Sequence, residues 1–283
     1  MATPFSFSIG DHYRVFPRPR WGHGQPPHPV ITRVFERARG RISAALDEIS
    51  AHRDALHAIA HERDAGNPVA PFWNNPWFST LDAASLVGFI LSRRPKRYLE
   101  IGSGHSTMFA AYAVRSGGTN THIRSIDPNP RAEIDALCSD VIRRPMEFGA
   151  PEIFDALEAG DILFFDGSHR AFQNSDVTVF FLDILPRLKP GVIVHVHDIF
   201  LPFDYPPAWE QALYSEQYLL AGMLMCGRPL FDVLLPNYFA QSDDALGARV
   251  RELFAAPGGA IPFRYPNKGA TLGCSFWMET KGG

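Results

Sequence analysis

The chain has 283 residues, of which 46% are apolar and 20% charged, so it can hold one sizeable α/β domain with additions. Its formal net charge of −3 argues against nucleic acid or an anionic membrane surface as the main partner. No apolar run reaches membrane-spanning length, residues 1–10 lack the pattern of a signal peptide, and Cys138, Cys226 and Cys274 are too dispersed for a metal site. These features predict a cytoplasmic protein with reduced thiols.

The first part of the chain differs in kind from the rest. Residues 1–29 are predicted to form an irregular arm, because proline and glycine crowd residues 11–29 and prevent regular structure. Residues 30–63 are predicted to be helical. Apolar side chains recur there every seven residues, at Phe35, Ile42, Ile49 and Leu56. This stripe forms either a cap on the main domain or the contact of a homo-oligomer, and the sequence leaves both interpretations open.

An aromatic loop follows at residues 71–78. Aromatic side chains at this density anchor a loop to a core more often than they stack on a bound ring. We therefore treat residues 30–79 as a helical segment with an aromatic loop, and residues 80–283 as the main domain. A helix over residues 83–91 is expected to lead into the first strand.

From residue 96 onward, predicted strands and helices alternate, which is typical of a parallel sheet covered by helices. The predicted strands are 97–101, 122–127, 140–144, 161–166, 191–197, 231–235 and 272–278. The predicted helices between and after them are 106–116, 130–138, 151–158, 175–186 and 209–226.

The turn after the first of these strands is the most informative stretch. The strand ends in Glu100 and Ile101, and Gly102-Ser103-Gly104 then leads into a helix. Two glycines let the backbone turn tightly and approach a ligand closely, as in the nucleotide sites of α/β proteins. A dinucleotide fingerprint would have a third glycine where this chain has Thr107. The pattern therefore favours a nucleoside ligand without phosphates.

A carboxylate ends the second predicted strand. Asp127 lies 25 residues beyond Gly102, at the tip of the neighbouring strand. A carboxylate at this place can accept hydrogen bonds from both hydroxyls of a ribose. The two features together predict a nucleoside site at this edge of the sheet.

The order of the elements, the motif at residues 99–104, Asp127 and the turn at residues 188–191 resemble the class I S-adenosylmethionine-dependent methyltransferases over about residues 80–280. The resemblance implies an α/β, Rossmann-like fold: a seven-stranded, mostly parallel sheet with an antiparallel last strand and helices on both faces, here with an N-terminal helical extension. It also implies S-adenosylmethionine as the cofactor, with the adenine beside Met146 and Glu147. The cofactor-binding residues predicted in this way are Glu100, Gly102, Ser103, Gly104, Asp127, Met146, Glu147 and Asp166.

Two further motifs narrow the resemblance. Asp166-Gly-Ser-His169 follows the fourth predicted strand and His197-Asp198 ends the fifth. They are similar to those of a bacterial branch of O-methyltransferases that act on small molecules or sugars, some of which depend on a divalent metal. The resemblance thus implies a small-molecule or sugar acceptor.

The carboxyl ends of strands four and five are where a ligand of such a sheet binds, so the polar residues there are the catalytic candidates. They are Asp166, His169, His197 and Asp198. We expect His169 to act as the general base or to orient the acceptor, titrating near neutral pH. A divalent metal held by Asp166, His197 and Asp198 is the alternative.

Three other residues are interpreted as structural or leave their role open between structure and function. His195 alternates with valines and is expected to be a buried core histidine. Glu216 and Tyr218 open a predicted helix that either faces the acceptor or is solvated.

Three classes of function remain open at this stage. The first is an S-adenosylmethionine-dependent methyltransferase that methylates a hydroxyl of a small molecule or glycan. The second is a nicotinamide-dependent Rossmann oxidoreductase, disfavoured by Thr107 in place of a third glycine. The third is a non-catalytic nucleoside-binding module, disfavoured by the polar residues at the strand ends.

Overall fold

The structure is a computed structural model that describes residues 16–149, 151–227, 230–256, 260–262 and 273–281. Its strands form one seven-stranded sheet in the order β3-β2-β1-β4-β5-β7-β6. The strands are β1 (Arg97–Ile101), β2 (His122–Ile126), β3 (Asp140–Ile142), β4 (Ile162–Phe165), β5 (Ile193–Val196), β6 (Phe231–Pro236) and β7 (Phe276–Thr280). Strands β1 to β5 pair in parallel, whereas β7 runs antiparallel to both β5 and β6. The predicted Rossmann-like sheet is confirmed.

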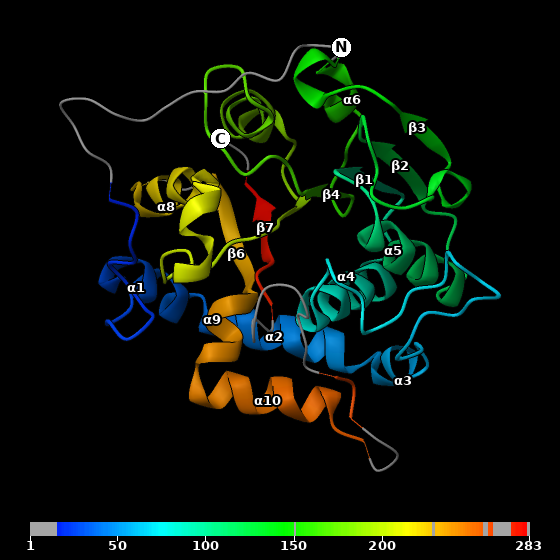
Figure 1. Ribbon diagram of the computed structural model, residues 1–283, viewed down its shortest axis with the longest axis horizontal. Coiled ribbons are helices and arrows are strands. Elements are labelled where there is room, and N and C mark those ends of the chain that lie inside the picture. The colour runs from blue at the N-terminus through cyan, green and yellow to red at the C-terminus, as the bar shows by residue number, and fades with distance from the viewer. Residues whose placement is uncertain (1–15, 150, 228–229, 257–259, 263–272, 282–283) are drawn as a thin grey trace.

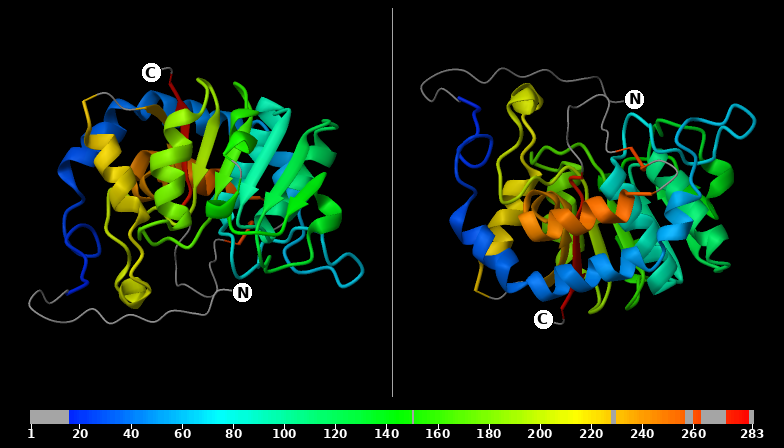
Figure 2. Two further views of the ribbon diagram at one scale, coloured as in Figure 1. Left: turned by 90° about the horizontal axis from the view of Figure 1, so that it is seen from above. Right: turned by 90° about the horizontal axis from the view of Figure 1, so that it is seen from below.

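Helices cover both faces of this sheet. They are α1 (Pro29–Arg37), α2 (Arg39–Ser50), α3 (Arg53–His57), α4 (Thr80–Arg93), α5 (His105–Ser116), α6 (Glu152–Asp155), α7 (Asp176–Val179), α8 (Glu216–Met225), α9 (Asn237–Ser242) and α10 (Asp244–Phe254). Figure 1 shows α2, α4, α5 and α10 on one side of the sheet and α6 on the other. Seen from below, α2 and α10 lie across the sheet (Figure 2).

The central strands are apolar on both faces, as a sheet covered twice by helices requires. All four residues of β4 are buried. In the next strand the ring of His195 stacks on Phe164 at 3.9 Å between centroids, and its Nε2 lies 2.5 Å from the hydroxyl of Ser275. Burial lowers the pKa of His195 well below its ordinary value. The prediction that His195 is a core histidine is confirmed.

The seven-residue stripe of the N-terminal segment packs inside the chain. Three helices, α1 to α3, replace the one long helix predicted over residues 30–63, and the last of them ends at His57. All four residues of the stripe are 0% exposed. Phe35 packs against Phe239 and Phe276 at ring distances of 5.2 and 6.0 Å. The interpretation of this stripe as an oligomer contact was therefore wrong, and the segment is a cap on its own domain. A homo-oligomer through another surface stays a prediction.

Replacing Ile49 with alanine is expected to destabilise this domain without changing its oligomeric state. Ile49 is fully buried, and a Cβ added to Gly88 of α4 would lie 2.8 Å from Ile49, so the two helices are in close contact. Truncation of such a side chain costs about 2–5 kcal/mol of unfolding free energy. Urea unfolding with light scattering tests this, and wild-type stability would show that α2 packs loosely.

The prediction of a helix at residues 130–138 was wrong. Asp127 Oδ1 accepts the N–H of Asn129 at 2.8 Å, which holds the chain in a turn after β2. The only helical part of this stretch is a 3₁₀ turn at Asp135–Leu137. Because an Asx turn competes with helix initiation, a proline beside an asparagine was a poor helix signal here.

The helix predicted at residues 209–226 is interrupted. A 3₁₀ helix at Pro207–Ala212 ends at Leu213, whose φ of 53° is left-handed, and α8 begins only at residue 216. The break exists because the N–H of Ser215 donates to the carbonyl of His169 at 2.8 Å. This hydrogen bond ties the loop before α8 to the segment that follows β4.

For the other predicted helices and the last strand, the structure differs from the prediction mainly in the bounds of the elements. The stretch at 151–158 holds only the four residues of α6. The stretch at 175–186 is helical from residue 176, with α7 continuing as a π turn at Phe180–Ile184 and a 3₁₀ turn at Leu185–Arg187. Strand β7 begins at residue 276, because the N–H groups of Cys274 and Ser275 bind the carboxylate of Asp82. Leu272, the predicted first residue of this strand, and residues 1–15 of the arm lie outside the described residues.

Candidate functional site

The glycine turn after β1 is packed against the end of β4. Gly102 has φ of +77°, and a Cβ there would lie 1.9 Å from the carbonyl oxygen of Asp166. A side chain at this position would therefore separate the two strand ends. The N–H of Gly102 donates to the carbonyl of Ile126 at 3.1 Å, so the turn is also tied to β2.

Glu100 lies behind this turn and is fully buried. It accepts hydrogen bonds from the hydroxyls of Tyr98 at 2.9 Å, of Ser106 at 3.1 Å and of Thr107. Burial raises the pKa of Glu100 to about 7, against the opposing effect of these donors. Thr107 in turn accepts the N–H of Gly104 at 3.0 Å. Glu100 and Thr107 thus fix the start of α5, which explains the threonine where a dinucleotide motif has glycine.

Asp127 closes the other side of the turn. Its Oδ2 accepts the N–H of Ser103 at 2.7 Å and the Ser103 hydroxyl at 3.1 Å. The carboxylate is therefore held at the rim of the space between β1 and β2, the place where a ribose is recognised in folds of this kind.

A cavity of about 400 Å³ lies at these strand ends. Six of the eight predicted cofactor residues line it: Gly102, Ser103, Asp127, Met146, Glu147 and Asp166. Glu100 does not, because it lies behind the turn, and Gly104 lines a smaller hollow next to it together with Trp77 and Phe78. Ser168, which follows β4 with Asp166, also lines the cavity, and the structure adds four polar residues that the sequence did not indicate: Asn129, Arg131, Ser175 and Asp176.

The aromatic loop serves mainly as an anchor. Phe72, Trp73 and Phe78 are buried, as expected for a loop fixed to the core. Trp77 is 40% exposed, and the guanidinium of Arg131 lies 4.7 Å from its ring centroid. This pair stands at the edge of the small hollow beside the cavity.

His169 stands at the centre of a carboxylate cluster. Its Nδ1 lies 2.5 Å from Glu216 Oε1, and its Nε2 lies 3.3 Å from Asp166 Oδ1 and 3.6 Å from Asp198 Oδ2. The backbone of His169 has φ of 63°, a left-handed value that is uncommon outside glycine and recurs at functional sites. Three carboxylates therefore converge on one imidazole.

This environment changes the pKa of His169 from the value expected from the sequence. Burial would lower the pKa of His169, but Glu216, Asp198 and Asp166 together raise it to about 9. The expectation that His169 titrates near neutral pH was therefore wrong. These carboxylates favour the charged form of the imidazole.

Glu216 is a partner of His169 and is not a solvated residue. It is fully buried at the start of α8, and burial raises its pKa to about 7 although His169 opposes this. The second oxygen, Oε2, has no hydrogen-bond partner among the described residues. The sequence named Glu216 but could not decide between these two environments.

His197 belongs to a second, deeper group. Its Nε2 lies 3.3 Å from Asp82 Oδ2, and its Nδ1 lies 3.5 Å from Asp198 Oδ1 and 3.6 Å from Asp166 Oδ1. Burial would lower the pKa of His197, but the surrounding acidic groups raise it well above its ordinary value. Asp82, on α4, also accepts the N–H groups of Cys274 and Ser275, so it joins α4, β5 and β7.

Two groups of side chains in the described part of the chain bring possible metal-ligand atoms together. In each group these atoms all lie within 4.8 Å of one another. The first is Asp166, His169 and Asp198, next to the cavity, and the second is Asp82, His197 and Cys274, which is entirely buried. The predicted set of Asp166, His197 and Asp198 thus divides between the two.

Comparison with known proteins assigns the fold. Residues 99–199, from β1 to the loop after β5, match the family described as a methyltransferase domain. The chain has a methyltransferase domain. This match agrees with the S-adenosylmethionine-dependent methyltransferase that the glycine turn and Asp127 indicated, and it favours methyl transfer over the oxidoreductase and non-catalytic alternatives.

Solved structures and curated proteins add little to this assignment. The methyltransferase PaMTH1 of Podospora anserina, with S-adenosylhomocysteine (SAH) bound, is 20% identical over 71% of this chain and 92% of its own, with a TM-score of 0.40. An O-methyltransferase of Bacillus cereus, also with SAH, is 14% identical over 84% of this chain and 91% of its own, with a TM-score of 0.40. No curated protein matches the sequence. At such low similarity, these structures do not assign any site residue of this chain.

In the described residues of this methyltransferase, none of the helices combines the length and the apolar character needed to cross a bilayer.

Proposed function

We propose that this methyltransferase transfers the methyl group of S-adenosylmethionine to a hydroxyl of a small molecule or glycan unit. One observation carries the proposal: Asp166 lines the cofactor cavity and at the same time faces His169 at 3.3 Å. The carboxylate and imidazole cluster therefore borders the place from which the methyl group leaves. A buried polar cluster at this point suits an acceptor that must be oriented and must lose a proton.

In this proposal the cofactor lies along the cavity of about 400 Å³. Asp127 accepts hydrogen bonds from the ribose hydroxyls, and the adenine lies beside Met146 and Glu147. Gly102 and Ser103 lie under the methionine part, which brings the sulfonium toward Asp166. Each of these residues lines the cavity, which supports the arrangement.

The reaction itself is an in-line displacement at the methyl carbon. The acceptor oxygen has to be aligned with the bond between sulfur and carbon, and positioning of this kind can supply several kcal/mol. The hydroxyl proton has to be removed as the new bond forms, which a suitable group accelerates by about two to four powers of ten. Asp166, His169 and Asp198 are the side chains that border the place where both would happen.

We further propose that Asp166, His169 and Asp198 hold a divalent cation. The observation behind this is electrostatic. Asp166, Asp198 and Glu216 all face His169, and Asp82 adds a fourth carboxylate at His197. The carboxylates thus outnumber the two imidazoles in this largely buried cluster, an excess of negative charge that a cation would reduce. Glu216 on the far nitrogen of His169 is also the arrangement that orients a metal-binding imidazole. When bound, such a cation would lower the pKa of the acceptor hydroxyl. His169 thus replaces His197 in the proposed ligand set.

Removal of the metal is expected to abolish activity. After dialysis against EDTA, titration with Mn²⁺ followed by electron paramagnetic resonance should reveal one bound ion per chain. Asp198→Asn should lose this site, whereas Asp140→Asn, a carboxylate on β3 away from the cluster, should retain it. Full activity after EDTA together with no bound Mn²⁺ would contradict the cation site. The side chains alone would then have to orient the acceptor and accept its proton.

Methyl transfer itself is tested with S-adenosylmethionine labelled at the methyl group. Purified protein is incubated with hydroxylated aromatic compounds and methyl glycosides, and the products are identified by NMR. The proposal predicts methyl ethers. Label on nitrogen or sulfur acceptors, with hydroxyl compounds left unmodified, would overturn the O-methyl assignment.

A further inference from the structure

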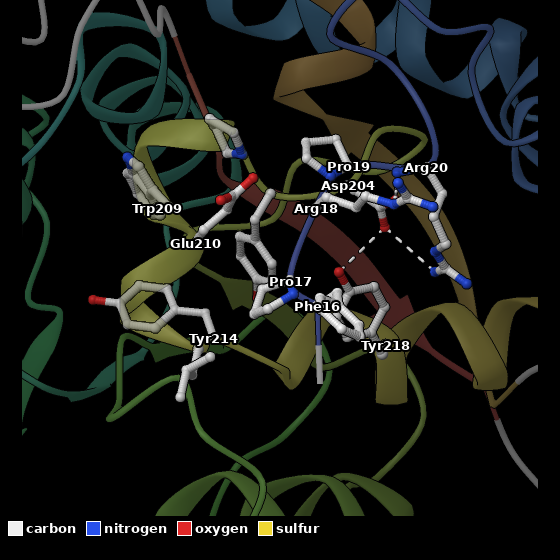
Figure 3. Close-up of a pocket in the computed structure, with 13 residues that line it drawn as sticks. Phe16, Pro17, Arg18, Pro19, Arg20, Asp204, Trp209, Glu210, Tyr214 and Tyr218 are labelled. Carbon is white, nitrogen blue, oxygen red and sulfur yellow. Dashed lines mark hydrogen bonds and ion pairs between the residues drawn. The ribbon is translucent and has the colours of Figure 1, made fainter. Parts of the chain in front are cut away.

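A second cavity, of about 470 Å³, lies between the N-terminal arm and the segment that connects β5 to α8. Residues 16–20 of the arm form one wall, and residues of the segment 204–218 form the rest (Figure 3). The volume falls in the range of sites for small organic ligands. It is separate from the cofactor cavity, with which it shares no lining residue.

Five of the thirteen residues that line this cavity are aromatic. Phe16, Tyr205, Trp209, Tyr214 and Tyr218 all line it. The rings of Tyr205 and Trp209 are nearly parallel, with an interplanar angle of 15°. In Figure 3, Trp209 and Tyr214 lie on one side of the cavity and Tyr218 on the other. Flat, apolar faces of this kind pack best against another planar ring.

Polar side chains also line this cavity, and some of them are engaged with one another. The guanidinium of Arg20 lies 3.5 Å from Asp204 Oδ1, which also accepts the hydroxyl of Tyr218 at 3.2 Å. Arg18 and Glu210 line the cavity as well, beside three prolines. The flat aromatic faces are therefore the feature that favours a planar ring as the ligand.

The buried carboxylate at this cavity is occupied in holding the arm. Asp204 Oδ2 accepts the backbone N–H of Arg20 at 2.6 Å and that of Trp21 at 3.2 Å. Its Oδ1 accepts the hydroxyl of Tyr218 at 3.2 Å, a contact drawn in Figure 3. The arm is thus fastened to the methyltransferase domain of its own chain. Asp204 serves as its anchor and is not a free group for a polyhydroxylated ligand.

The cavity adjoins the carboxylate cluster. Tyr214 lines the cavity, and its ring centroid lies 4.4 Å from that of His169. Tyr205 also lines it, and its hydroxyl accepts the N–H of Gln217, the residue after Glu216. A ligand seated between the rings would therefore lie one aromatic side chain away from His169.

We infer that this cavity holds a planar aromatic part of the methyl acceptor, with the arm at residues 16–20 as its outer wall. The inference rests on the proposed function, because it takes His169 and its carboxylates as the place where the acceptor hydroxyl reacts. It selects an aromatic, hydroxyl-bearing small molecule over a glycan unit as the acceptor.

Calorimetric titration in the presence of saturating SAH tests the binding. The probes are β-naphthol and methyl α-D-glucopyranoside, and β-naphthol alone is expected to bind. Loss of one aromatic contact is expected to weaken β-naphthol binding by about two- to tenfold. Trp209→Ala removes a buried ring, whereas Phe16→Ala removes one that is 74% exposed and so leaves the core intact. Leu182→Ala, a truncation of another exposed apolar side chain, should bind as the wild type does.

A second readout connects the cavity to the reaction. With methyl-labelled S-adenosylmethionine, β-naphthol should be converted to its methyl ether, and Phe16→Ala should raise KM more than it lowers kcat. Binding of the glucoside in place of β-naphthol, wild-type binding by both aromatic variants, or binding without methyl transfer would each overturn the inference. Failure of the wild type to bind SAH would instead contradict the proposed function, so the two failures are distinguishable.

Discussion

Replacing His169 with alanine is expected to lower kcat by about two to four powers of ten. His169 is the only imidazole in the described structure that faces Asp166, Asp198 and Glu216 together. Its loss leaves Glu216 without its imidazole partner, and Asp166 and Asp198 with His197 as their remaining imidazole. Affinity for SAH should stay close to that of the wild type, because His169 does not line the cofactor cavity. Steady-state kinetics on an acceptor found by labelled methyl transfer, with calorimetry of SAH, measure both quantities.

The control for this prediction is His122→Ala. His122 begins β2, at the end of the strand opposite to the cofactor cavity, and its side chain is 47% exposed. It should retain wild-type kcat. A His169→Ala enzyme with wild-type turnover would remove the cluster from the mechanism, and the acceptor would then have to be activated elsewhere.

Replacing Asp127 with alanine is expected to lower the affinity for SAH at least tenfold. Hydrogen bonds to a charged group are worth about 1.5–3 kcal/mol, and this carboxylate is proposed to accept two from the ribose. The substitution also releases the N–H of Ser103, so the glycine turn loses one of its ties. Calorimetry with SAH on a variant shown to be folded by circular dichroism measures the change.

Asp140→Ala is the matched control for Asp127. Asp140 lies on the neighbouring strand β3, pairs with Arg124 at 2.7 Å and does not line the cavity. Its affinity for SAH should equal that of the wild type. If Asp127→Ala also bound SAH normally, Asp127 would have no part in ribose recognition.

The sheet and the cofactor cavity could be predicted from the sequence because their signals are local. An apolar run followed by Gly102 and Gly104 marks β1 and its turn within a few residues, and the apolar run of β4 bounded by turn residues does the same for that strand. Asp127 needs only the assumption that the next strand pairs in parallel with β1, which the register confirms. Errors arose where one hydrogen bond redirected the chain, as at Asn129 and at Ser215.

The carboxylate cluster could be predicted only in part, because it depends on contacts between residues distant in sequence. Glu216 is 47 residues from His169, and Asp82 is 115 residues from His197. No local pattern records that α8 brings a carboxylate to the end of β4, or that α4 brings one behind β5. The pKa of His169 follows from these same contacts, so its rise to about 9 was equally hidden from the sequence.

The most direct test of the proposed site is a crystal structure of the protein with SAH. We expect SAH in the cavity of about 400 Å³, with its ribose hydroxyls on the carboxylate of Asp127 and its adenine beside Met146 and Glu147. Its sulfur should lie on the side of Asp166. SAH bound outside this cavity, or with its ribose away from Asp127, would contradict the assignment of the cofactor site and of the reaction centre next to it.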